Sequence, residues 1–342
     1  MKKEVVMNFL TSFVSVAIMV ALAVPGFVLR KRKMLPEKAV ATLVIVLIYV
    51  SQPFLTISSF LSKDYEKELL INMLITFGFS IAFHLVAYFL SELAFLPFSK
   101  RKRKNETDEE YAVRNEKYLA GSRMGVVTSF MGNIGFMGMP VMRALFPEHP
   151  EMLIYTAVFM IGFHIASWTL GVYKITKDKR NISLKSAFLN PPVFALVVAI
   201  PLFFLKHYIP ETILTPLSDG VGYLADMTLP LSMIIIGMRL AEIPIKDLLS
   251  DVRAYVVCVV KLVIAPMVSL GIMLLIRLVF SSLDEMVIIT SFIVMAMPSA
   301  ASTLTFAEKF GGDRETAVRA TLITTVLSVL SIPLLMLLCA VI

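Results

Sequence analysis

Charge and cysteine are both scarce in this sequence of 342 residues. Only 17% of the residues are charged, against about a quarter in an ordinary soluble domain, and 58% are apolar. The two cysteines, Cys258 and Cys339, both lie inside apolar runs, which excludes a disulfide framework and a cysteine-based metal site. A helix that crosses a bilayer needs about 20 mostly apolar residues, and such runs fill the chain. The composition therefore predicts an all-α integral membrane protein without a soluble domain of ordinary size.

Run length, together with the charged residues, prolines and glycines between runs, predicts ten transmembrane helices. We expect the sixth to be short and the third, fourth and seventh to be long. The predicted spans are Val5 to Leu29, Ala39 to Phe60, Leu69 to Phe98, Tyr118 to Leu145, Met152 to Tyr173, Pro192 to Leu205, Ile213 to Leu240, Tyr255 to Phe280, Met286 to Phe310 and Ala317 to Ile342.

Basic residues are distributed unevenly between the loops that join these spans. The odd-numbered loops hold 24 of them, and the termini and even-numbered loops hold 7. By the positive-inside rule, the odd loops are cytoplasmic and both termini lie outside the cell membrane. The net charge of +7 follows from this topology and does not indicate a nucleic-acid partner. The expected partner is the lipid bilayer.

Prolines in two of the predicted spans have counterparts five spans later in the chain. Pro53 in the second span has a counterpart in Pro230 of the seventh, and Pro140 in the fourth has one in Pro298 of the ninth. Five is an odd number of crossings, so the second unit is upside down relative to the first. The sequence therefore predicts two inverted five-helix repeats, an arrangement typical of secondary transporters, with chance recurrence among 17 prolines as the alternative. The repeats would cover residues 1–187 and 188–342.

Spans four and nine each carry a cluster of helix-breaking residues. Span four has three glycines at spacing three with Asn133 and Pro140, and span nine has Pro298 followed by hydroxyl side chains. Lipid offers freed backbone groups no water, so these segments must be buried in protein or line a cavity, although a close helix-packing face would also explain the glycines. We expect both helices to break at mid-depth, so that amides after Pro140 and Pro298 hold a carboxylate at two half-helix N-termini. The predicted substrate-site residues are Gly132, Asn133, Gly135, Phe136, Gly138, Pro140, Pro298, Ser299, Ser302 and Thr303.

Motifs at these positions resemble the auxin efflux carrier family, which includes plant hormone carriers and bacterial malonate and malate carriers. The similarity lies in Gly132 to Pro140, Leu229 to Ser232, Met297 to Ala300 and Phe310 to Asp313. It implies crossed helices 4 and 9, a scaffold of spans 1, 2, 6 and 7, and a moving domain of spans 3–5 and 8–10. It also implies elevator-type transport of a small organic anion, a mono- or dicarboxylate. Sodium-coupled symport of the bile-acid type is the alternative, and a homodimer is left open.

Ionisable side chains at membrane depth are costly and mark functional sites by default. Asp226 is the first candidate for coupling, because a carboxylate can take up a proton or ligate sodium; a water-exposed helix end is the alternative. Lys261 either attracts the anion or snorkels to the inner interface. His84 and His164 could each take a proton, although lone histidines are more often hydrogen-bonded core residues, and we prefer His164. Gln52 completes the coupling candidates, and no cofactor beyond a coupling proton or sodium ion is expected.

An intramembrane enzyme and a receptor or passive channel are the alternatives to a carrier. An intramembrane enzyme needs a nucleophile and a base, and Ser302 with His164 could be proposed. The sequence contains neither a Gly-x-Ser-x-Gly nor a His-Glu-x-x-His motif, so we do not expect an enzyme. A receptor or passive channel would show no dependence on an ion gradient. Direct ATP use is not expected either, since no P-loop motif is present.

Overall fold

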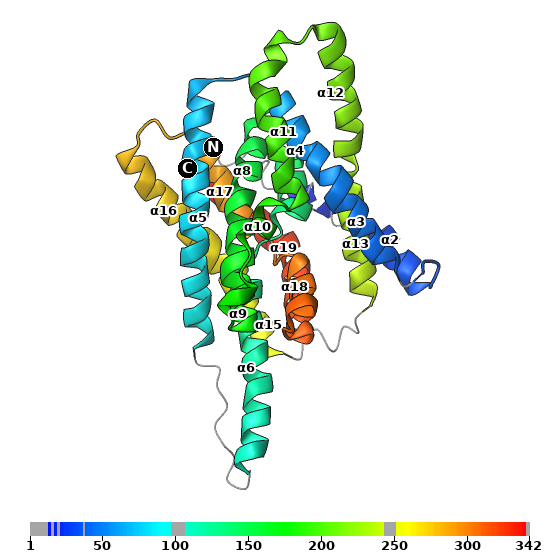
Figure 1. Ribbon diagram of the computed structural model, residues 1–342, viewed down its shortest axis with the longest axis vertical. Coiled ribbons are helices and arrows are strands. Elements are labelled where there is room, and N and C mark those ends of the chain that lie inside the picture. Colours follow the sequence, from blue (N-terminus) through cyan, green and yellow to red (C-terminus); the bar gives the residue numbers. More distant parts are fainter. Residues whose placement is uncertain are drawn as a thin grey trace.

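The computed structural model describes residues 13–14, 17–18, 21–36, 38–96, 107–242 and 251–339. Within these ranges the regular elements are helices, joined by one isolated antiparallel bridge between Gly132 and Ser299. Figure 1 shows the helices packed side by side along the long axis of the molecule. Several predicted features lie outside the described residues: Val5 and Ile342 at the ends of the first and last spans, the basic run Lys100 to Lys104, and Lys246.

The helices of the first half include three π-helical turns. In chain order the elements are α2 (Ala23–Lys31), α3 (Ala39–Val46), a π turn (Leu47–Ser51), α4 (Gln52–Leu61), α5 (Lys67–Phe95), α6 (Asp108–Phe130), a π turn (Ile134–Gly138), α7 (Met139–Leu145), α8 (Glu151–Ala166), a π turn (Ser167–Gly171), α9 (Val172–Thr176) and α10 (Leu184–Phe188).

The second half adds a fourth π turn. Its elements are α11 (Pro191–Leu205), α12 (Glu211–Asp226), α13 (Thr228–Ala241), α15 (Val252–Val259), the π turn (Val260–Ile264), α16 (Ala265–Val279), α17 (Glu285–Ala296), α18 (Ser302–Phe310) and α19 (Arg314–Cys339).

Seven helical segments of the described chain are long and apolar enough to cross a membrane. They match the predicted second, third, fifth, sixth, seventh, eighth and tenth spans. Two shorter apolar helices, Ile134–Leu145 and Glu285–Ala296, belong to the predicted fourth and ninth spans. The all-helical architecture agrees with the composition. The seven are Ala39–Leu61, Lys67–Phe95, Glu151–Thr176, Lys179–Tyr208, Glu211–Ala241, Val252–Val279 and Arg314–Cys339.

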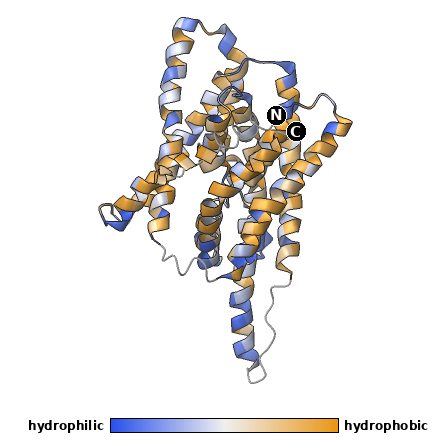
Figure 2. Ribbon diagram, turned by 180° about the vertical axis from the view of Figure 1, so that it is seen from behind, coloured by the Kyte–Doolittle hydropathy of each residue, from blue (hydrophilic) through white to orange (hydrophobic). Residues whose placement is uncertain are grey.

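The helix of the fourth span begins earlier than the apolar run that starts at Tyr118. A capping box starts it: the Glu110 amide donates to Thr107 Oγ1 at 3.2 Å, and the Thr107 amide donates to Glu110 Oε2 at 3.0 Å. Asp108 and Glu109 add negative charge to the first turn, where the helix dipole favours it. Figure 2 shows this part of α6 as a hydrophilic extension below the bundle.

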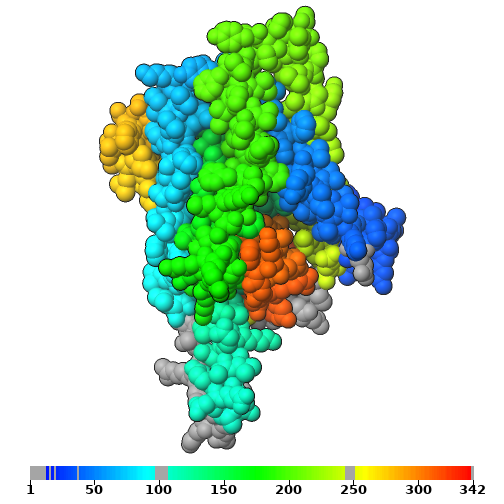
Figure 3. All heavy atoms as spheres, in the orientation of Figure 1, coloured from blue at the N-terminus to red at the C-terminus, as the bar shows by residue number. Residues whose placement is uncertain are grey.

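Helix contacts fall into two groups. In one, α2 packs along α13, and α4 packs against α11 and α12. In the other, α5 packs against α6 and α8, α15 against α19, and α16 against α17. Weaker contacts of α8 with α4 and α11 join the two groups. On the face shown in Figure 3, α18 lies beside α9, below α3.

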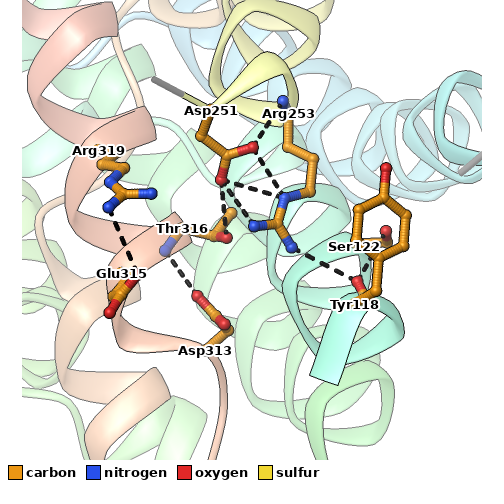
Figure 4. A network of polar contacts seen from close by, with 8 residues as sticks. All are labelled: Tyr118, Ser122, Asp251, Arg253, Asp313, Glu315, Thr316 and Arg319. Atoms are coloured by element: carbon orange, nitrogen blue, oxygen red, sulfur yellow. Dashed lines mark hydrogen bonds and ion pairs between the residues drawn. The ribbon is translucent and has the colours of Figure 1, made fainter. Parts of the chain in front are cut away.

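A polar cluster ties α6, α15 and α19 together at one end of the bundle. Figure 4 shows Arg253 paired with Asp251, with 2.8 Å between Nη2 and Oδ2. Arg253 Nη1 also donates to the Tyr118 carbonyl at 3.4 Å, and the Thr316 hydroxyl donates to Asp251 at 3.4 Å. Burial alone would raise the pKa of Asp251, but the hydrogen bonds from Arg253 outweigh it and hold the pKa below its usual value.

Candidate functional site

Both predicted helix interruptions are present, and they meet. Helix α6 ends at Phe130 and helical structure resumes at Ile134, while α17 ends at Ala296 and α18 begins at Ser302. The two extended segments are joined by two backbone hydrogen bonds of 2.8 Å: the Asn133 amide donates to the Pro298 carbonyl, and the Ala300 amide donates to the Met131 carbonyl. Backbone groups that lose their helical hydrogen bonds in one interruption are therefore partly paired with those of the other. Backbone buried away from water needs such partners.

The last helix also supports the interruption in span nine. The Ser299 amide donates to Thr324 Oγ1 on α19 at 3.1 Å. Thr303 Oγ1 donates to the Ala300 carbonyl at 2.7 Å and lies 3.1 Å from Thr321 Oγ1. The hydroxyl of Thr303, a predicted substrate-site residue, is thus engaged in holding the break. Other hydroxyls of α19, those of Thr324, Thr325 and Ser328, donate to carbonyls three or four residues earlier in the same helix, as hydroxyl side chains in packed helices commonly do.

A small cavity of about 70 Å³ lies at the crossing. Two half-helices begin on its wall, one with Ile134, Gly135 and Phe136, the other with Ala301 and Ser302. The first amides of a helix have no partner within it and carry the positive end of its dipole. None of the described residues that line the cavity is acidic. The wall of the cavity is therefore electropositive and suited to an anion.

Polar side chains from distant parts of the chain also reach this cavity. Gln52 is only 2% exposed, and a Cβ added at Gly135 would collide with its Nε2, so glycine makes room for the amide. His164 and Asn133 line the same space. Within the described residues, Gln52 Nε2 and His164 Nε2 are buried without a hydrogen-bond partner. Buried donors in this state are available to a ligand.

Lys261 lies directly against the crossing. It sits in the π turn of span eight and is 0% exposed, so of the two alternatives the one in which it snorkels to the interface is wrong. A Cβ added at Gly132 would lie 2.8 Å from its Nζ, and no described residue accepts a hydrogen bond from that Nζ. His84 is also buried, and its Nδ1 is bonded to the Ser80 carbonyl at 2.7 Å.

Asp226, the first candidate for coupling, is not brought to the crossing. It ends α12, its side chain is 60% exposed, and it forms an ion pair with Arg143 at 2.6 Å. These two residues line a different cavity of about 290 Å³ together with Pro140. Asp226 therefore matches the alternative interpretation, a helix-end residue reached by water.

Pro140 does not mark the break in span four. It lies in the first turn of α7, and the helix interruption precedes it at residues 131–133. Pro140 thus lies inside the helical segment Ile134–Leu145 and not at its start. The prediction that free amides follow Pro140 is therefore wrong: the first turn after the break follows Asn133, and its first amide, that of Ile134, donates to the Gly132 carbonyl at 2.9 Å. Gly138 is buried and faces Met297, with Cγ 3.4 Å from where its Cβ would lie.

Sequence reasoning missed several residues of the cavity wall. Asn190 is the one with a polar side chain, and Met160 and Phe163 contribute apolar surface. Asn190 precedes α11, and its side chain makes no capping hydrogen bond to that helix. The available signal was an amide side chain directly before two prolines at the start of a predicted span.

The sequence of this chain is similar to those of known membrane transporters. Residues 178–336 match a family model described as "Membrane transport protein". An uncharacterized transporter of Methanocaldococcus jannaschii is 26% identical over 328 residues, covering 93% of this chain and 96% of that protein. An uncharacterized transporter of Methanothermobacter thermautotrophicus is 25% identical over 334 residues, covering 96% of this chain and 98% of that protein. The family model covers slightly less than half of the chain, and the two relatives are 26% and 25% identical. Together these similarities support a multi-pass membrane transporter of the auxin efflux carrier type, not an enzyme.

Proposed function

We propose that the protein is a secondary carrier of a small organic anion, whose carboxylate binds where the fourth and ninth spans cross. The observation that carries this proposal is the convergence of two half-helix N-termini, at Ile134 and Ser302, on one cavity without an acidic wall. Each N-terminus is equivalent to roughly half a positive charge. Together they offset much of the cost of taking a carboxylate out of water.

Side chains around the crossing add polar groups that can orient the anion and hold it in place. Asn133 and Ser302 line the cavity and can orient the anion through an amide and a hydroxyl. Gln52 offers a buried amide donor, and Lys261 places a buried amine, which is a counter-charge when protonated, beside Gly132. An ammonium group held in a low-dielectric interior attracts an anion more strongly than one in water.

Buried bases favour a proton over sodium as the coupling ion. His164 lines the cavity, and the Lys261 amine lies beside Gly132 on its wall. Nitrogen bases can take up a proton with the anion, whereas sodium is held by oxygen ligands. Proton-coupled movement of the anion is therefore the form of transport that we propose.

The helix contacts support ten spans in two inverted repeats and an elevator motion. The contact of α2 with α13 joins spans one and seven, and its repeat-related counterpart, α11 with α4, joins spans six and two. The contact of α5 with α8 joins spans three and five, and its counterpart, α15 with α19, joins spans eight and ten. In the proposed motion, the group with spans three to five and eight to ten carries the crossing past the scaffold of spans one, two, six and seven.

Replacement of Asn133 by alanine tests the site. The variant loses the side-chain amide but keeps both backbone hydrogen bonds of the crossing, because these use main-chain atoms. We expect Asn133→Ala to reduce carboxylate uptake into proteoliposomes at least about tenfold, which corresponds to one lost polar contact. Pro298→Ala, which places an extra amide in the break, is expected to abolish uptake. A screen of mono- and dicarboxylates under separate proton and sodium gradients identifies the substrate and the coupling ion.

Asn72→Ala is the matched control. Asn72 is a buried asparagine on α5 that does not line the cavity. Its replacement is expected to leave uptake per folded transporter unchanged. Undiminished uptake by Asn133→Ala in correctly inserted protein would sink the assignment of the substrate to the crossing.

A further inference from the structure

A second and larger pocket, of about 470 Å³, lies between α5, α6 and α9, away from the crossing. Its wall carries three basic side chains, Arg123, Lys174 and Lys177, against one carboxylate, Glu92. Apart from Ser122, the remaining wall is aromatic or apolar and includes Leu96. This combination of basic and apolar surface has no part in the proposed transport site.

The positive charge of this pocket is only partly neutralised. Lys174 is paired with Glu92, with Nζ and Oε2 2.6 Å apart. Arg123 donates from Nη2 to Glu116 at 2.6 Å, while its Nη1 is buried and has no hydrogen-bond partner among the described residues. Lys177 lies on the exposed rim. Because Glu92 pairs with Lys174, Arg123 and Lys177 are the basic groups of the wall that remain for a ligand, and a guanidinium with an ammonium group suits a phosphate.

The pocket lies where protein, lipid and water meet. Leu96 on its wall is 69% exposed, and Phe89 and Leu93 continue an exposed apolar stripe along α5. Figure 2 shows that the neighbouring helix α6 becomes hydrophilic just below this level. A ligand in the pocket would thus have its anionic end among basic groups and its apolar part along α5. A free phosphate would use only the first of these two surfaces.

We propose that this pocket binds the phosphate headgroup of an anionic phospholipid from the leaflet that faces the basic loops, with its acyl chains along Phe89, Leu93 and Leu96. Basic pockets between transmembrane helices bind anionic headgroups in this way. The bound lipid would link α5, α6 and α9, which belong to a single group of packed helices. The proposal does not depend on the substrate or on the coupling ion.

Native mass spectrometry of the purified full-length protein tests the proposal. Phosphatidylglycerol and phosphatidylcholine with the same acyl chains are added at equal concentration. We expect preferential adducts with phosphatidylglycerol, and a loss of about fivefold in their abundance for Arg123→Gln or Lys177→Gln, as expected for the loss of one basic group near an anionic headgroup. Lys177→Gln changes an exposed side chain, so it keeps the test valid if Arg123→Gln folds poorly.

Lys179→Gln is the matched control, because Lys179 is an exposed lysine that does not line the pocket. It is expected to keep the full preference for phosphatidylglycerol. Glycerol 3-phosphate added in excess should displace little lipid, since it cannot use the apolar stripe. Equal binding of the two lipids, equal loss in all three variants, or displacement by glycerol 3-phosphate at lipid-like concentration would each overturn the proposal.

Discussion

Lys261 carries a fully buried side-chain amine that no described residue pairs with. A buried polar group without a partner costs stability, whether or not it is charged, so its removal should relieve that cost. We expect Lys261→Met, which keeps the length of the side chain, to raise the thermal unfolding temperature. The same variant should reduce carboxylate uptake by about tenfold or more, because the proposed anion loses a counter-charge. Scanning fluorimetry in detergent and uptake by proteoliposomes measure the two effects on one preparation.

Lys206 offers the matched comparison. Its ammonium group is also buried, but it donates to the carbonyls of Leu61 at 2.9 Å and Lys63 at 2.7 Å and lies 3.0 Å from Asp64 Oδ1. Lys206→Met should therefore lower the unfolding temperature and leave uptake per folded transporter unchanged. If Lys261→Met behaved in the same way, Lys261 would be a structural residue and not part of the anion site.

At the level of single residues, the sequence predicted chemical type better than location. Asn133 was expected at the crossing, and Gln52 and His164 were predicted as coupling candidates without a location; the structure brings all three to one cavity. Asp226, the first coupling candidate, lies elsewhere, because its helix ends at that residue and Arg143 of another helix pairs with it. Position along a span gives depth in the membrane but not the direction of a side chain, which depends on contacts between helices.

Glycines set the closest contact between two helices, α2 and α13. A Cβ added at Gly237 would overlap the Ala23 carbonyl and lie 2.9 Å from the Phe27 amide nitrogen. The obstructing atoms are backbone, so they cannot move aside as a flexible side chain would. We expect Gly237→Ala to lower the free energy of unfolding by about 1–3 kcal/mol, the usual cost of overpacking. Chemical unfolding in detergent, followed by circular dichroism, measures the change.

Gly220 in α12 provides the opposite case within the same group of helices. A Cβ there would meet no atom within 4 Å. Gly220→Ala should therefore raise the free energy of unfolding by about 0.5–1 kcal/mol, because alanine restricts the unfolded chain and favours helix. Equal changes for both variants would mean that the contact between α2 and α13 is looser than the structure shows.

At the level of elements, composition predicted the broken helices but not their details. Glycines and a proline within an apolar run cannot form a regular lipid-exposed helix, so the breaks in spans four and nine could be anticipated. The π turns Leu47–Ser51 and Val260–Ile264 could not. A π turn inserts one residue and rotates the side chains around it, and a run that is apolar on all sides carries no periodicity to reveal this. Gln52 follows the first of these turns and Lys261 lies in the second.

Over the whole molecule, the proposed inverted repeat would account for two separate observations. The spacing of the prolines pairs spans one to five with spans six to ten, and the contacts of α2 with α13 and of α4 with α11 are related by the same pairing. One observation rests on sequence spacing and the other on packing.

The distribution of basic residues predicts which end faces the cytoplasm, and cysteine labelling tests it. Glu109 at the hydrophilic start of α6 and Glu211 at the start of α12 are both exposed and lie at opposite ends of the bundle in Figure 1. In a chain whose Cys258 and Cys339 are replaced by alanine, Glu211→Cys should react with a membrane-impermeant maleimide on intact cells. Glu109→Cys should react only after the membrane is permeabilised, because its loop belongs to the basic set. The reverse pattern would overturn the predicted orientation but not the proposed inverted repeat. Labelling of both positions on intact cells would mean that the chain does not cross the membrane an odd number of times between Glu109 and Glu211.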